Sequence, residues 1–120
     1  MTRTEAGDML GVALDAKGLG GVQLGTTPVW FELAQGTLTC RALVYRFHAP
    51  AAPAVLAKLQ QGPRDANAAL EYDAASRALC LTRSYAQPVS NADFQQHLGV
   101  LVAAALRWAD VEIDRLFGLV

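Results

Sequence analysis

The sequence has little of the material that metal sites, disulfide frameworks and nucleic-acid surfaces require. Its 120 residues include only two cysteines, Cys40 and Cys80, and two histidines, His48 and His97, and none of the four stands at a zinc-ligand spacing. We expect reduced, half-buried cysteines, no metal and no cofactor. Ten basic residues against eleven acidic ones give a net charge of −1, so nucleic acid is not an expected partner.

Long apolar runs are also missing. The longest, residues 99–106, is too short to span a bilayer, and Glu5 and Asp8 stand where a signal peptide needs an apolar stretch. We therefore expect a cytoplasmic protein that does not bind membranes.

The chain is rich in apolar residues within that limited length. They make up 52% of the sequence, much of it alanine, and a domain of about this size buries only about two-thirds of the surface of its unfolded chain. We expect residues 1–120 to form one domain with apolar surface left over for a partner.

The first half of the sequence predicts one helix and three strands. Residues 4–17 carry apolar side chains at helical spacing, although Gly7 and Gly11 weaken that helix. A glycine-rich stop leads into a short strand around residues 22–24. Residues 29–33 and 37–47 alternate as two strands joined by a tight turn at residues 34–36.

The second half predicts a short helix, a hairpin and a long helix. Pro53 suits a first helical turn, and Gly62 with Pro63 marks its end. Residues 68–72 and 78–83 flank a polar loop. Ser90 is a good N-cap for a helix of about 25 residues, about 37 Å long, whose apolar stripe comprises Phe94, Leu98, Leu101, Val102, Ala105, Trp108, Ile113 and Leu116.

The predicted order is therefore α-β-β-β-α-β-β-α, which places the chain in the α+β class with an antiparallel sheet backed by helices. Trp30 and Phe31 are adjacent on one predicted strand and must point to opposite faces of that sheet. Either helices cover both faces, or one of these aromatic side chains marks a binding surface.

Catalytic patterns are weak. The run Gly18, Gly20 and Gly21 lacks the third spaced glycine of a dinucleotide loop and follows a helix, so we interpret it as a turn. His97 with Asp93 has no nucleophile at a suitable spacing. Glu71 and Asp73 fit a solvated strand end better than a carboxylate pair. We predict that the protein is not an enzyme.

The order of elements and the last 60 residues resemble the class I type III secretion chaperones, the Tir-chaperone-like family of small acidic homodimers. The resemblance rests on the segment LAKLQQGPRDANAALEYDAASRALCLTRSYAQPVSNADFQQHLGVLVAAALRWADVEIDRL, with a short helix, an Asn-bearing connection, a hairpin and a long helix carrying a tryptophan. It implies a chaperone-like domain that binds the extended N-terminal segment of a secreted effector without ATP and keeps it secretion-competent.

The resemblance also implies two sets of site residues. The homodimer interface would use the short helix and the fourth strand, through Val55, Leu56, Leu59, Ala69, Leu70 and Tyr72. The effector-binding patches would use Met9, Leu10, Leu14, Val22, Leu24, Val29 and Phe31. A YbjN-like regulatory or adaptor domain that binds folded partners shares this topology and remains the alternative.

Overall fold

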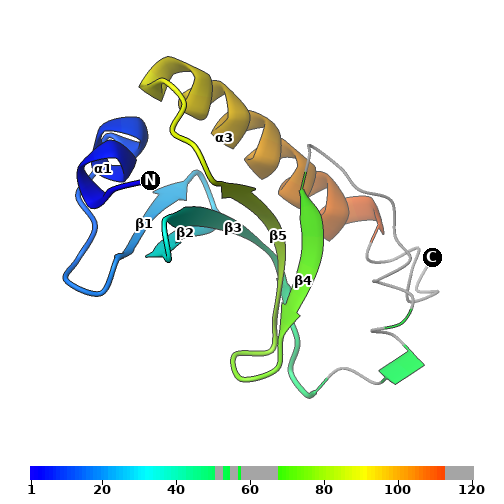
Figure 1. Cartoon of the computed structure of the whole chain (residues 1–120). Helices are drawn as coiled ribbons and strands as arrows, with labels where there is room; N and C mark the ends of the chain where they lie inside the picture. Colours follow the sequence, from blue (N-terminus) through cyan, green and yellow to red (C-terminus); the bar gives the residue numbers. More distant parts are fainter. Residues whose placement is uncertain (51–52, 55–56, 58–67, 113–120) are drawn as a thin grey trace.

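The computed structural model describes residues 1–50, 53–54, 57 and 68–112 (Figure 1). Its elements follow the predicted order: α1 (Arg3–Leu10), β1 (Leu19–Leu24), β2 (Thr27–Ala34), β3 (Thr37–Arg46), β4 (Ala69–Asp73), β5 (Ala78–Tyr85), α3 (Asn91–Arg107) and a π-helical turn, η1 (Trp108–Glu112). Residues 53, 54 and 57 are helical, and the rest of the short helix predicted there lies outside the described residues. The α+β prediction is confirmed.

All five strands form one antiparallel sheet in the order β1-β2-β3-β5-β4, which makes β1 and β4 its edges. The tight turn predicted between β2 and β3 consists of Gln35 and Gly36, both with positive φ, as a two-residue hairpin turn requires. An irregularity between Leu43 and Tyr45 shifts the register of β3 against β5.

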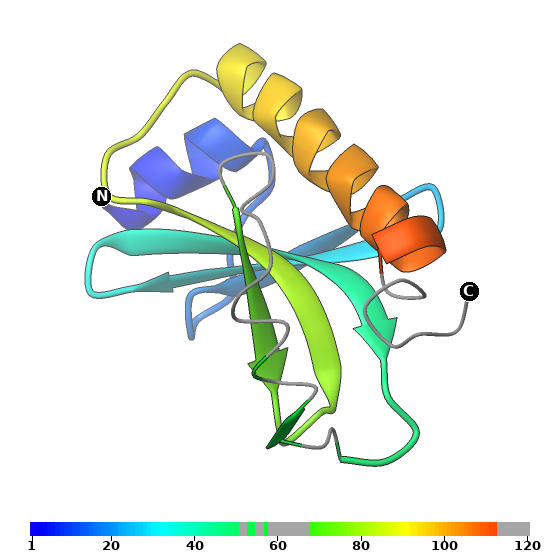
Figure 2. The same cartoon turned by 90° about the vertical axis from the view of Figure 1, so that its right-hand side faces the viewer.

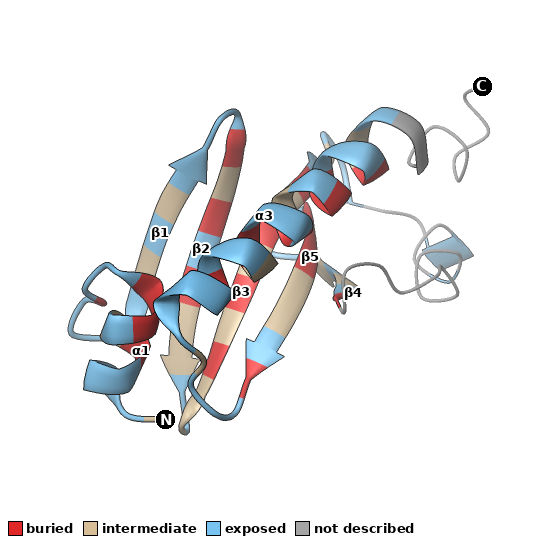
Figure 3. Cartoon of the chain, turned by 90° about the horizontal axis from the view of Figure 1, so that it is seen from above, coloured by how far each residue is buried: buried red, intermediate tan, exposed pale blue. Residues whose placement is uncertain are grey.

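The described helices lie on one face of the sheet (Figures 1 and 3). The alternating positions of β2 and β3 on this face are buried, including Val29, Phe31, Leu38 and Cys40. The Phe31 and Phe94 rings meet edge to face with centroids 6.0 Å apart. The core is therefore the layer between the sheet and the two helices, and no described helix covers the opposite face.

The first helix is shorter than predicted. It begins with a capping box, in which Glu5 N–H donates to the Thr2 hydroxyl and Thr2 N–H donates to the Glu5 carboxylate, and it ends at Gly11 in the left-handed conformation. The prediction of a helix to residue 17 was wrong because Asp15 organises a turn there: its carboxylate accepts from the N–H groups of Lys17 and Leu19 at 2.8 and 2.9 Å.

The last helix begins as predicted, with the Ser90 hydroxyl accepting from the Asp93 N–H at 3.1 Å. Figures 2 and 3 show α3 running across β2, β3 and β5. The predicted stripe faces the core at Phe94, Leu98, Leu101, Ala105 and Trp108, whereas Val102 is half-buried. Ile113 and Leu116 lie outside the described residues.

Candidate functional site

The strand β1 offers an open edge. It pairs with β2 and has no second partner within the described part of the chain. Its first carbonyl, that of Leu19, already accepts from the Asp15 N–H at 2.8 Å, so the preceding turn covers the start of this edge. Further along β1, the described residues leave the outward backbone groups available to pair with an additional strand.

The residues predicted to bind a client divide into two groups. Five of them lie in the core, with exposed fractions between 1 and 8%: Met9, Leu10, Leu14, Val29 and Phe31. Val22 is half-buried against that core, and Leu24 is exposed at 36%. The accessible part of the predicted patch is therefore Val22 and Leu24, on the open edge strand.

Sequence reasoning missed two further exposed apolar side chains in this region. Val12 follows α1 and was placed inside the predicted helix, and Leu19 opens β1 and was assigned to the glycine-rich stop. The glycine at position 20 has a packing reason, because a Cβ there would approach Leu14 Cδ2 to 3.0 Å. Because Gly20 has no side chain, Leu14 can pack over the start of β1.

The opposite edge, β4, carries three of the residues predicted at the dimer interface. Ala69 is exposed, whereas Leu70 and Tyr72 are half-buried and pack against the core. β4 pairs with β5 and has no other described neighbour in the sheet. The other predicted interface residues, Val55, Leu56 and Leu59, lie outside the described residues.

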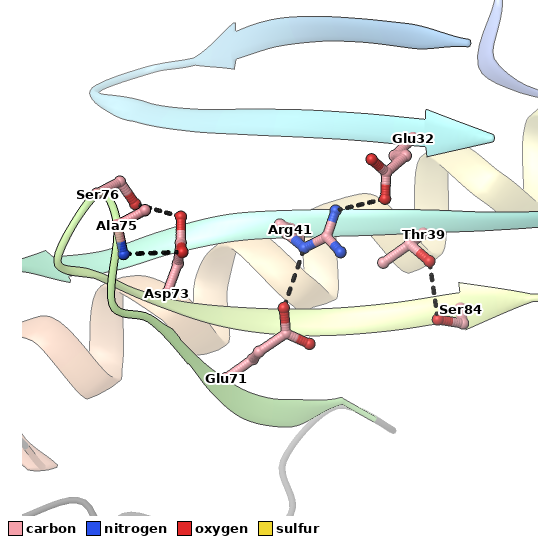
Figure 4. Close-up of polar contacts among 8 residues, drawn as sticks. All are labelled: Glu32, Thr39, Arg41, Glu71, Asp73, Ala75, Ser76 and Ser84. Atoms are coloured by element: carbon pink, nitrogen blue, oxygen red, sulfur yellow. Dashed lines mark hydrogen bonds and ion pairs between the residues drawn. The ribbon is translucent and has the colours of Figure 1, made fainter. Parts of the chain in front are cut away.

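The face of the sheet away from the helices carries charged side chains together with the exposed indole of Trp30. There Arg41 lies between two carboxylates, with Nη1 3.5 Å from Glu32 Oε1 and Nε 3.2 Å from Glu71 Oε1 (Figure 4). Thr39 and Ser84 share a hydroxyl–hydroxyl bond of 3.2 Å beside them. Trp30, Arg41 and the two glutamates border a hollow of about 750 Å³ that extends to Arg46, Asp73 and Cys80.

His97 is hydrogen-bonded within the fold, and both cysteines are buried. The Tyr85 hydroxyl lies 3.0 Å from His97 Nδ1, and the two rings stack. Burial raises the pKa of the Cys40 thiol to about 12 and that of Cys80 to about 11, so both remain protonated and weakly nucleophilic at neutral pH. Across the described ranges, no three His, Cys, Asp or Glu side chains gather as a metal site.

Each helix within residues 1–50 and 68–112 is too short or too polar to span a bilayer.

The sequence matches no protein-family model and no curated protein. Solved structures do match. A chain of the crystal structure of the ExsC–ExsE complex aligns over 91% of this chain and 89% of its own, with a TM-score of 0.70 and 17% identity. A chain of the HopA1–SchA chaperone–effector complex aligns over 82% and 80%, with a TM-score of 0.64 and 14% identity. The secretion-chaperone-like fold expected from the sequence is therefore confirmed.

Proposed function

We propose that this chain is a class I type III secretion chaperone. In this proposal it acts in the cytoplasm as a homodimer, binds the N-terminal segment of an effector in extended form and keeps that segment competent for secretion. The observation that carries the proposal is the fold shared over most of both chains with a chain from a complex whose partners are named as chaperone and effector.

The open edge of β1 supplies a physical route for such binding. An extended segment pairs its backbone with the outer side of β1, and its apolar side chains contact Val22, Leu24 and Leu19. The residues beneath, including Phe31 and Leu14, hold the strand in place from the core. Ordering a disordered segment costs about 2–5 kcal/mol or more, so a long contact is needed.

The homodimer supplies that length. If two copies meet at β4 and at the short helix predicted before it, their β1 edges lie on the outside of the pair, and one client can follow both. We propose no catalytic role for the exterior opposite the helices, where Arg41 forms ion pairs with Glu32 and Glu71.

The decisive experiment is co-expression with candidate effectors, followed by hydrogen exchange on the purified complex. We expect one extended effector segment per dimer and slower exchange at the β1 amides. Leu24→Asp should weaken the complex, whereas Val100→Asp, which places the same charge on an exposed apolar position of α3, should leave it intact.

Two results would contradict the proposal. A protein that binds only a folded domain would instead be the YbjN-like adaptor. A monomer that protects no β1 amide with any extended segment would show that the fold serves another function.

A further inference from the structure

The face of the sheet that no described helix covers holds a compact row of side chains. Trp30 lies directly opposite Arg41 in the β2–β3 register, and Arg41 lies opposite Thr82 on β5. Glu32 and Glu71 reach Arg41 from β2 and β4, so four strands contribute to one hollow (Figure 4). The hydroxyl oxygen of Thr82, the residue opposite Arg41, is buried and has no hydrogen-bond partner among the described residues.

The charges around this hollow do not balance. Glu32, Glu71 and Asp73 oppose Arg41 and Arg46, which leaves one negative charge in excess. Asp73 stays ionised, because hydrogen bonds from the Ser76 hydroxyl and the Ala75 N–H lower the pKa of its carboxyl. The field in the hollow therefore favours a cation.

The two glutamates have capacity for a further donor. Each uses only its Oε1 atom toward Arg41, and each side chain is close to half exposed, at 43% for Glu32 and 51% for Glu71. Arg46 is engaged elsewhere, since its Nη1 donates to the Ser76 carbonyl at 3.1 Å. A second guanidinium entering the hollow would meet unused carboxylate oxygens on both sides of Arg41.

Trp30 supplies the apolar part of the same recognition. Its indole lies over Gly21, where a Cβ would be 3.7 Å from Trp30 Cδ1, and it remains 38% exposed. A planar guanidinium stacks on an indole face better than an ammonium does, and it donates to carboxylates through a fixed fork. A ligand that carried a carboxylate would be repelled by the excess negative charge of the hollow.

We propose that this hollow binds an arginine side chain of the client polypeptide, which stacks on Trp30 and donates to Glu32 and Glu71. The proposal rests on the proposed function for the identity of the client, but the site itself requires only a basic extended chain. It predicts that a client segment carries an arginine where it passes the uncovered face of the sheet.

The test uses a peptide of sequence Gly-Arg-Arg-Gly with blocked termini, alongside versions in which citrulline or glutamate replaces arginine. The reporters are the two tryptophan indole N–H signals in a nitrogen–proton correlation spectrum of the full chain. Trp30→Phe identifies the Trp30 signal by its loss, and the buried Trp108 is the internal reference. We expect the arginine peptide alone to shift the Trp30 signal saturably, and less at high salt.

Glu32→Gln and Glu71→Gln should each weaken this peptide about two- to fivefold, as removal of one exposed ion pair does. Asp110→Asn, the same loss of charge on the exposed η1 turn, should not. Equal responses to citrulline, a response to glutamate, an unmoved Trp30 signal or unchanged affinity in both Gln variants would overturn the proposal. Because the peptide is not a client, failure of effector binding alone would count against the proposed function and not against this site.

Discussion

Trp30 and Phe31 are neighbours in β2 with opposite surroundings: Phe31 is 2% exposed and Trp30 is 38% exposed. Phe31→Ala should lower the free energy of unfolding by about 3–5 kcal/mol, because it removes a ring packed against Phe94 and leaves a cavity. Trp30→Ala should cost less than about 1 kcal/mol. Urea denaturation of both variants measures the difference, and similar losses would show that Trp30 is packed more tightly than its exposure indicates.

Ser90 provides a second test at a single residue. Ser90→Ala removes the hydroxyl that caps α3 and should cost about 1 kcal/mol. Ser84→Ala is the matched control, because Ser84 also makes a hydroxyl bond but at an exposed position of β5, where the loss should stay within about 0.5 kcal/mol. Equal midpoint shifts for the two variants in thermal unfolding would contradict the role of the cap.

The two buried cysteines should make the free energy of unfolding decrease at alkaline pH. Burial raises the thiol pKa from 9.0 to about 12 at Cys40 and about 11 at Cys80. The unfolded chain therefore loses these protons first, so the stabilisation is complete below about pH 9 and declines as the pH rises from there toward pH 11 to 12. Unfolding measured at pH 8 and pH 10 should show this decline.

Cys40→Val keeps an apolar side chain at that position and removes its titration, so it should lose less stability than the unaltered chain over the same pH interval. Iodoacetamide should label neither cysteine of the folded protein at pH 8 and both in urea. Rapid labelling of folded protein would show that the thiols are accessible.

At the scale of elements, turns fix how the strands join. Gly18 has φ of 78°, and a Cβ there would lie 2.5 Å from the Leu33 carbonyl oxygen, while Gly25 has φ of 62° and open space around it. Gly25→Ala should cost about 1–2 kcal/mol for the left-handed backbone alone. Gly18→Ala should cost clearly more, because β1 must also move away from β2, and denaturant midpoints of the two variants rank them.

The elements that sequence predicted best are those whose signals are local. Ser90 with the apolar stripe after it locates α3, and alternation around a tight turn locates β2 and β3. The end of α1 depended on backbone conformation at Gly11 and on the Asp15 carboxylate, which periodicity does not report. The burial of Met9, Leu10 and Val29 depended on where α3 packs, which is set by contacts between segments far apart in the sequence.

For the candidate site, sequence could show that Trp30 and Phe31 diverge, but not which of them faces out. It also gave no sign that Arg41 lies between Glu32 and Glu71, because these residues come from three strands and β5 lies between β3 and β4 in the sheet. The register of the sheet decides which residues of distant strands lie side by side, and the amino-acid composition does not reveal that register.

At the scale of the whole molecule, the proposal requires two copies, and Ala69 tests it. Ala69 is exposed on the edge strand β4, beside the half-buried Leu70. At a two-fold interface along β4, Ala69→Glu would place a carboxylate from each copy in a desolvated contact, where like charges repel. Light scattering should then fall from about twice 12.8 kDa to about 12.8 kDa.

Ala103→Glu is the control, because it adds the same charge to an exposed position on α3, away from either sheet edge, and should remain dimeric. Both variants should melt close to the unaltered chain when measured at a concentration where all are monomeric, since neither position is packed. A dimer that persists in Ala69→Glu would show that the interface does not lie along β4. That result would also remove the reason for expecting one client to follow both β1 edges.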